Sequence, residues 1–164
     1  MRYYDTLPVQ FSRGCPFDCE FCDIVHLFGR NPRTKAPAQF IAELDAVRAT
    51  GYDGAVFVVD DNLIGNKNAV KQLLPYVIRW QEAHGYPMTF FTEASIDLAD
   101  DDELMGMLSQ AGFDAVFIGI ETPSDESLAE CSKRQNRNRD MVEDVKRIQR
   151  AGLQVQGGFI VGFD

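Results

Sequence analysis

Three cysteines, spaced C-x-x-x-C-x-x-C, are the residues whose types and spacing most clearly indicate chemistry: Cys15, Cys19 and Cys22. They directly follow a short apolar run at residues 9–11. The thiolate is the form of cysteine that binds metal, and thiolates held this close repel one another unless a metal neutralises them. We therefore expect a metal or iron–sulfur centre here. Three protein ligands leave one coordination position open, as in catalytic rather than structural centres.

A structural zinc site is the alternative for these cysteines, with His26 as the fourth ligand, because zinc accepts three thiolates and one imidazole. Structural zinc sites usually take their cysteines as C-x-x-C pairs from two separated segments, so the single cluster of cysteines favours iron–sulfur chemistry. Without zinc, His26 is expected to be a polar loop residue. Cys131 lies in a polar stretch far along the chain, where we expect a small, partly buried residue or an unused thiol.

Length and composition predict one soluble domain, because the chain has 164 residues and 45% of them are hydrophobic. The formal net charge of -9 argues against binding nucleic acid through a broad basic face. No apolar run approaches the ~20 residues that a membrane span needs, and residues 1–5 lack the apolar core of a signal peptide. We therefore expect a cytoplasmic protein in a reducing compartment, with no disulfide scaffold.

Short runs rich in Val, Ile and Phe alternate with longer segments of helical periodicity, which predicts alternating strands and helices. A proline at position 75 should kink or break the helix that contains it. The expected strands lie at residues 8–12, 55–59, 88–92, 115–118 and 154–161, and the expected helices at 38–49, 68–84, 100–111, 124–131 and 140–151.

Repeated strand–helix units build either an open doubly wound sheet or a barrel. Polar residues follow strand after strand: the cysteines, the segment 60–62, Glu93 and Glu121. Because the carboxyl ends of barrel strands meet at one mouth, this pattern favours a barrel. The predicted fold is therefore α/β, a partial (β/α) barrel with parallel strands and outer helices. The chain stops after an apolar strand with no helix to cover it, so we expect a piece of a longer protein, truncated before a sixth strand.

The motif C-x-x-x-C-x-aromatic-C, with Phe21 as the aromatic residue, resembles the signature of the radical S-adenosylmethionine (radical SAM) superfamily. The resemblance covers essentially the whole chain and implies that residues 1–164 are a radical SAM core domain, incomplete at its C-terminus. It implies that Cys15, Cys19 and Cys22 hold a [4Fe–4S] cluster whose open iron is chelated by SAM. An electron from an external donor would then split SAM into methionine and a deoxyadenosyl radical that abstracts hydrogen. No side chain is expected to act as a catalytic acid, base or nucleophile.

The same resemblance suggests which residues contact SAM. The segment Asp60-Asp61-Asn62 stands where the family often has Gly-Gly-Glu, which meets the SAM amino group, although both glycines are lost here. Glu121 resembles the residue that bonds the ribose hydroxyls, and Lys133 the residue that pairs with the SAM carboxylate. The full set of expected cofactor contacts is Phe21, Asp60, Asp61, Asn62, Glu93, Ser95, Glu121, Lys133 and Gly158.

Simpler interpretations of these residues stay open. Asp60 and Asp61 are also compatible with a hard cation, or with solvated turn residues. The glycines near Gly158 are compatible with close packing alone. The basic residues at 133–139 are compatible with a solvated loop, or with RNA binding, which the acidic remainder of the chain disfavours.

The segments 12–17, 59–66 and 158–164 look like the cobalamin-associated branch of the superfamily, which includes the hopanoid C-2 methylases. Members of that branch usually carry a cobalamin-binding domain before the barrel, and this chain has none. The implied parent protein is a cobalamin-dependent methyltransferase acting on a small-molecule or lipid substrate. The non-enzyme alternative is a zinc-stabilised α/β binding module without catalysis.

Overall fold

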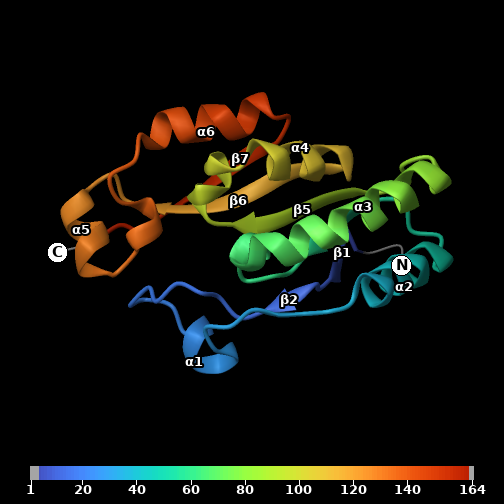
Figure 1. The fold of residues 1–164 in the computed structure, drawn as a ribbon, viewed down its shortest axis with the longest axis horizontal. Coiled ribbons are helices and arrows are strands. Elements are labelled where there is room, and N and C mark those ends of the chain that lie inside the picture. The colour runs from blue at the N-terminus through green and yellow to red at the C-terminus, as the bar shows by residue number, and fades with distance from the viewer. Residues whose placement is uncertain (1–3, 163–164) are drawn as a thin grey trace.

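The main sheet contains five parallel strands in the order β1-β4-β5-β6-β7. The computed structural model describes residues 4–162, so the last two residues of the segment 158–164 lie outside the described part. Each long strand joins the sheet beside the long strand that precedes it in the chain, which is the winding of a barrel and not of a doubly wound sheet (Figure 1). The prediction of a partial (β/α) barrel is confirmed. The strands are β1 Thr6–Val9, β4 Ala55–Val58, β5 Thr89–Ala94, β6 Phe113–Glu121 and β7 Gln154–Phe159.

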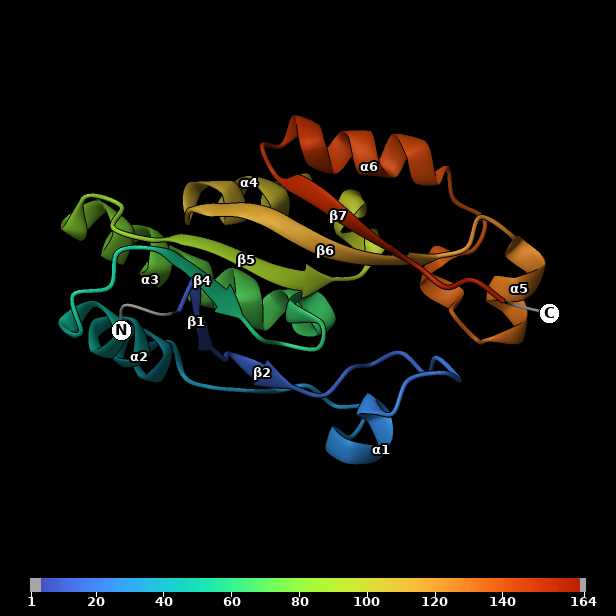
Figure 2. The same cartoon turned by 180° about the vertical axis from the view of Figure 1, so that it is seen from behind.

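The longer helices cover one face of this sheet. In Figure 1, α3 and α4 lie in front of the strands and α6 lies above them, and in Figure 2, from behind, the strands come forward. Strand β5 shows the consequence: Phe90, Thr92 and Ala94 are buried, whereas Phe91 and Glu93 on the opposite face are half-buried. That opposite face is the inner wall of the partial barrel. The helices are α2 Pro37–Ala49, α3 Lys67–His84, α4 Asp102–Gln110 and α6 Met141–Arg150.

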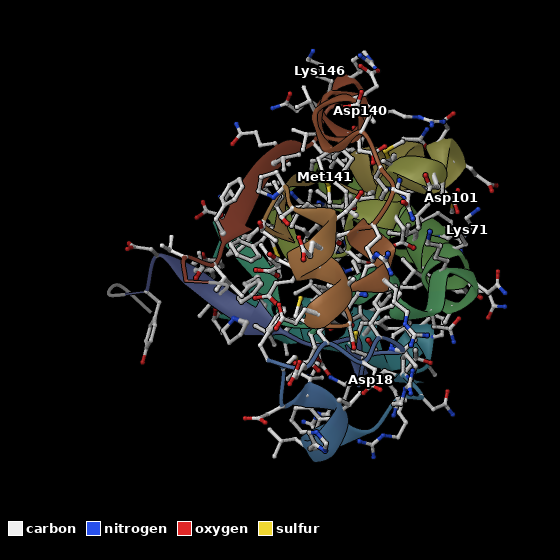
Figure 3. All side chains as sticks on the ribbon, turned by 90° about the vertical axis from the view of Figure 1, so that its left-hand side faces the viewer. Asp18, Lys71, Asp101, Asp140, Met141 and Lys146 are labelled. Atoms are coloured by element: carbon white, nitrogen blue, oxygen red, sulfur yellow. The ribbon has the colours of Figure 1, made fainter. Side chains whose placement is uncertain are left out.

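Short elements connect the strands and helices, several of them beyond the carboxyl ends of the strands. Figure 3 views the molecule from that end, with α5 in front and α1 below it, and with Lys71 of α3 beside Asp101, to which it is ion-paired at 2.9 Å. The short elements are β2 Ser12–Arg13, α1 Ile24–Phe28, β3 Arg33–Thr34, η1 Leu63–Asn66, η2 Ile96–Asp100, α5 Asp125–Glu130 and η3 Arg134–Asn136, where η denotes a 3-10 helix.

The first strand differs from its prediction at residues 8–12. Strand β1 ends at Val9, and Ser12 begins a separate two-residue strand that pairs with β3. The cause is the carboxylate of Asp60, which accepts hydrogen bonds from the backbone N–H groups of Phe11 (2.7 Å) and Ser12 (2.6 Å). These groups therefore bond to a side chain instead of a neighbouring strand. Asp60 is only 1% exposed, and this burial raises the pKa of its carboxyl.

Of the two outcomes expected at Pro75, a kink or a break, the break is wrong, because α3 is a single helix from Lys67 to His84. Leu73, Leu74 and Val77, on both sides of the proline, are buried in the same core. A proline removes one intrahelical hydrogen bond, and burial of this apolar face outweighs that loss. The helix expected at residues 100–111 also begins later, after η2, because Asp101 caps α4 by accepting from the Leu104 N–H.

Arg139 attaches α6 to the rest of the domain. Its guanidinium donates hydrogen bonds to both carboxylate oxygens of Asp100 in η2 (2.8 and 2.6 Å) and to Asp144 in α6 (2.7 Å). The Arg139 side chain is 16% exposed, so the residue is not the solvated loop residue that the basic run suggested. Its hydrogen bonds lower the pKa of Asp100.

We predict that replacing Asp60 with Ala lowers the free energy of unfolding by about 2–4 kcal/mol, because it leaves two buried N–H groups without an acceptor. Urea unfolding followed by circular dichroism measures the change. The neighbouring D61A variant is the control, since within residues 4–162 the Asp61 side chain accepts a single, longer bond of 3.3 Å, from the Gly14 N–H. We expect the control to lose less than about 1 kcal/mol. Equal losses in both variants would contradict this role for Asp60.

We predict that Arg139→Gln destabilises the protein by about 1–3 kcal/mol at pH 7, because hydrogen bonds to charged groups are lost. The folded state lowers the Asp100 pKa, so this stabilisation is present above the unfolded value of about 3.9 and is lost as the pH falls through the folded pKa. Urea unfolding of both proteins at several pH values should show the difference narrowing in acid. A difference in unfolding free energy between the two proteins that stays constant down to pH 2 would contradict this role for the Arg139–Asp100 contact.

Candidate functional site

A cavity of about 170 Å³, here called the cysteine pocket, lies at the carboxyl ends of the strands. The three clustered cysteines, Cys15, Cys19 and Cys22, all line it. The pocket brings together residues from five separate segments of the chain, at positions 15–22, 61–62, 93–95, 117–121 and 133–135. Of the expected cofactor contacts, those that also line the pocket are Phe21, Asp61, Asn62, Glu93, Ser95, Glu121 and Lys133.

Two of the expected contacts, Asp60 and Gly158, do not line this cavity. Asp60 lies behind it, with its carboxylate bonded to the backbone after β1. Gly158 is in β7, paired in register with Gly119 of β6. A Cβ atom at Gly158 would lie 2.7 Å from the ring of Phe117, so the glycine makes room for that ring.

The loop that carries the cysteines is held by backbone hydrogen bonds on two sides. The Cys15 N–H donates to the carbonyl of Gly29 (3.3 Å), and the Glu20 N–H donates to the carbonyl of Cys131 (3.0 Å). Gly14 allows the first contact, because it has φ of +102° and a Cβ there would lie 2.8 Å from the Gly29 oxygen. Cys131 is 5% exposed and does not line the pocket, as expected of a structural cysteine.

Burial raises the pKa of the Cys15 and Cys19 thiols. Side-chain amides oppose this effect: Asn62 Nδ2 lies 3.9 Å from the Cys15 sulfur, and Gln135 Nε2 lies 3.6 Å from the Cys19 sulfur. Neighbouring cysteines act in the same direction as burial, since thiolates close together repel. A metal that binds these sulfurs must therefore displace their protons.

Glu121 and Lys133 form a buried ion pair on one wall of the pocket. The Lys133 ammonium donates to Glu121 Oε1 at 2.6 Å, and each residue is less than 10% exposed. Glu121 ends β6 with φ of +64°, a left-handed conformation that is uncommon for a residue other than glycine. The backbone of Gly119 lies beneath the pair, and a Cβ there would be 2.4 Å from Glu121 Oε1 and 2.7 Å from Lys133 Nζ. Lys133 also lies 5.5 Å from the centre of the Phe21 ring.

Asn62 and Ser95 join the ends of β4 and β5. Asn62 Nδ2 donates to Ser95 Oγ at 3.1 Å, and the Ser95 N–H donates to Asn62 Oδ1 at 3.3 Å. Both residues are buried, and both line the cysteine pocket. Nearby, burial and the charge of Asp61 raise the pKa of Glu93. This side of the pocket thus offers uncharged polar atoms and two carboxyl groups.

Several residues of the site were missed by sequence reasoning. Gln135 lines the pocket, and Asn136, which is 1% exposed, donates to the carbonyls of Gly119 (2.9 Å) and Ile120 (3.0 Å). Asn136 thereby fixes η3 against the end of β6. The only signal in the sequence is that both residues follow Lys133 closely in a polar run, which does not distinguish them from solvated residues.

His26, the fourth ligand of the alternative zinc site, is exposed on α1 and does not line the cysteine pocket. Within residues 4–162, no three His, Cys, Asp or Glu side chains are gathered closely enough to hold a single metal ion. The three clustered cysteines therefore share one pocket but do not form a single-ion site.

Comparison with known proteins identifies the class of protein that this fold and site define. The model of the radical SAM superfamily matches residues 9–164, so the chain belongs to the radical SAM superfamily. An uncharacterized methyltransferase of Synechocystis sp. is 56% identical over 161 residues, 98% of this chain. The hopanoid C-2 methylase of Rhodopseudomonas palustris is 42% identical over 95% of the chain. This chain spans 30% of the length of each of these relatives.

Solved structures share the fold. The radical SAM methyltransferase TsrM from Kitasatospora setae, solved with cobalamin and a [4Fe–4S] cluster, superposes with a TM-score of 0.78 at 18% identity, over 94% of this chain and 30% of that one. The cobalamin-dependent radical enzyme OxsB superposes with a TM-score of 0.76 at 21% identity, over 94% of this chain and 23% of that one. Within residues 4–162, no helix has the length and apolar character needed to cross a membrane.

Proposed function

We propose that this chain is the core of an enzyme that binds a [4Fe–4S] cluster through Cys15, Cys19 and Cys22 and binds SAM beside it. The observation that carries the proposal is the shared cavity: the three cysteines of the signature line the same pocket as the Glu121–Lys133 ion pair and the Asn62–Ser95 pair. Family membership makes the cluster the expected group, and the resemblance assigns the SAM contacts.

The donor set of the pocket fits these two groups. Tetrahedral zinc with bonds of about 2.3 Å would need its sulfurs about 3.8 Å apart. A cluster gives each cysteine its own iron, so the thiols need not converge on one point. SAM carries an amino group, a carboxylate and ribose hydroxyls. Lys133 matches the carboxylate, Glu121 the ribose hydroxyls, and the oxygens of Asp61 and Asn62 match the amino group.

The chemistry that such a cluster supplies is a one-electron reduction of the SAM sulfonium, which breaks a carbon–sulfur bond to give methionine and a deoxyadenosyl radical. The residues of this chain bind and orient SAM for that event. The Glu121–Lys133 pair keeps both charges satisfied before SAM arrives, since an unpaired buried charge is strongly unfavourable. The rings of Phe21 and Phe117 line the same cavity and give it an apolar part.

We propose methyl transfer as the activity of a longer protein that contains this chain. The relatives named above as methylases and methyltransferases support this, as does the fold shared with cobalamin-dependent radical SAM enzymes. The proposed partners are an external electron donor, cobalamin held outside this chain, and a small-molecule or lipid substrate. The apolar inner wall, where Phe57 and Phe91 stack with ring centres 4.6 Å apart, is suited to a substrate with an apolar part.

We predict that anaerobic reconstitution with iron and sulfide gives a brown protein with about four irons per chain, because one [4Fe–4S] cluster fills the site. Single C15A, C19A and C22A variants should each lose the cluster. The C131A variant should keep it, because Cys131 lies outside the pocket. Iron analysis and the absorption spectrum measure the outcome.

A zinc-stabilised binding module would behave differently in the same experiment. It would bind one zinc per chain, remain colourless and release no deoxyadenosine from SAM under dithionite. Stoichiometric zinc with no cluster would contradict the proposed function, as would equal loss of iron in C131A.

We predict that Gly119→Ala weakens SAM binding by about tenfold or more while changing stability little. The added Cβ collides only with the ends of two flexible side chains, Glu121 and Lys133, so these move at small energetic expense and leave their positions. Equilibrium dialysis of SAM against the reconstituted protein measures the affinity. The control is G106A, where a Cβ meets nothing within 4 Å and should stabilise α4 by about 0.5–1 kcal/mol. An unchanged affinity for SAM in G119A would show that the ion pair does not take part in SAM binding.

A further inference from the structure

Gln135 makes a contact in the cysteine pocket that the proposed function does not use. Its Nε2 atom lies 3.6 Å from the Cys19 sulfur, within hydrogen-bonding distance for sulfur. Its Oε1 atom is buried and has no hydrogen-bond partner within the described residues. A buried polar atom without a partner is unfavourable, so Oε1 does not determine the orientation of this amide. The contact of Nε2 with the Cys19 sulfur determines it.

The chemistry of the sulfur explains that orientation. A thiolate that binds iron has no proton and acts only as an acceptor, so only the NH₂ end of an amide can face it. Gln135 already presents this end to Cys19. We propose, on the basis of the cluster site above, that Gln135 is a positioning residue that raises the reduction potential of the cluster by donating a hydrogen bond to the Cys19 sulfur.

The physical basis is the charge on the cluster. When an external low-potential reductant gives one electron to the oxidised cluster, the negative charge on the cysteine sulfurs increases, while no covalent bond to Gln135 forms or breaks. A hydrogen bond to a sulfur therefore stabilises the reduced cluster more than the oxidised one. This makes the cluster easier to reduce.

The fold holds the donor in place. Gln135 lies in η3 between two anchored residues: Lys133 pairs with Glu121, and Asn136 donates to the carbonyls of Gly119 and Ile120. Both anchors attach η3 to the end of β6. The amide of Gln135 thus needs little ordering when the cluster is bound. The corresponding contact at Cys15, from Asn62, is longer at 3.9 Å, so Gln135 should have the larger effect.

The test is a redox titration of the reconstituted protein without SAM, followed by electron paramagnetic resonance of the reduced cluster. In Q135L, we expect the ratio of reduced to oxidised cluster at a fixed potential to fall about tenfold, which for one electron is a shift of about 59 mV to more negative potential. Q135E keeps the shape but replaces the donor with an acceptor, so it should shift the potential further in the same direction. The control is Q110L, which makes the same change on an exposed residue of α4.

If Gln135 had a purely structural role, Q135L would lower the stability of the protein. We expect the opposite: Q135L removes the unpartnered Oε1 atom, so its stability should equal or exceed that of the unmodified protein. Exchangeable-proton couplings of the reduced cluster, measured in H₂O and D₂O, should decrease in Q135L. Full iron content with a potential equal to that of Q110L would overturn the inference about Gln135 alone. Failure of the unmodified protein to bind a cluster would overturn the proposed function and this inference with it.

Discussion

The carboxylate of Asp60 is the contact on which the geometry of the site depends. It lies at the end of β4, and its hydrogen bonds with Phe11 and Ser12 end β1 and turn the chain away from the sheet. The cysteine loop begins at Gly14, two residues after Ser12. A buried carboxylate that accepts backbone N–H groups is strongly directional, because both of its oxygens have fixed partners. The loop therefore leaves the sheet at one defined point, next to the ends of the neighbouring strands.

The pocket itself is built from alignment of the strand ends. Parallel strands in sequential order bring Asn62, Ser95 and Glu121 to one edge, although each lies at the end of a different strand. The loops after β1 and β6 then close over this edge. Their contacts are mutual: the Cys131 carbonyl accepts from Glu20, and Gln135 donates toward Cys19. The region after β6 thus supports the cysteine loop as well as supplying Lys133.

The charged groups of the pocket are one buried ion pair and two neighbouring carboxyl groups. Glu121 and Lys133 satisfy one another, and Glu93 faces Asp61 with a raised pKa. A buried ion pair gains little stability because both partners lose their hydration. In the proposed function the pair contributes specificity, because a zwitterionic molecule such as SAM would exchange partners with it and leave neither charge unpaired. The pair lies directly on the backbone of Gly119, where a Cβ atom would come within 2.7 Å of both charged groups.

Much of this arrangement could be predicted from residue order. The cysteine spacing, the uniformly apolar strands and the polar residues that follow them depend on local chemistry and on the periods of strands and helices, so they determined the partial barrel and most of the pocket. Sequence order could not show that Asp60 binds the backbone behind the pocket, that Pro75 lies within one continuous helix, or that Gln135 faces Cys19. Each of these depends on contacts between residues far apart in the chain or on burial of a whole helix face. Only tertiary packing decides them, because a side chain selects among possible partners according to which ones the fold brings within hydrogen-bonding distance.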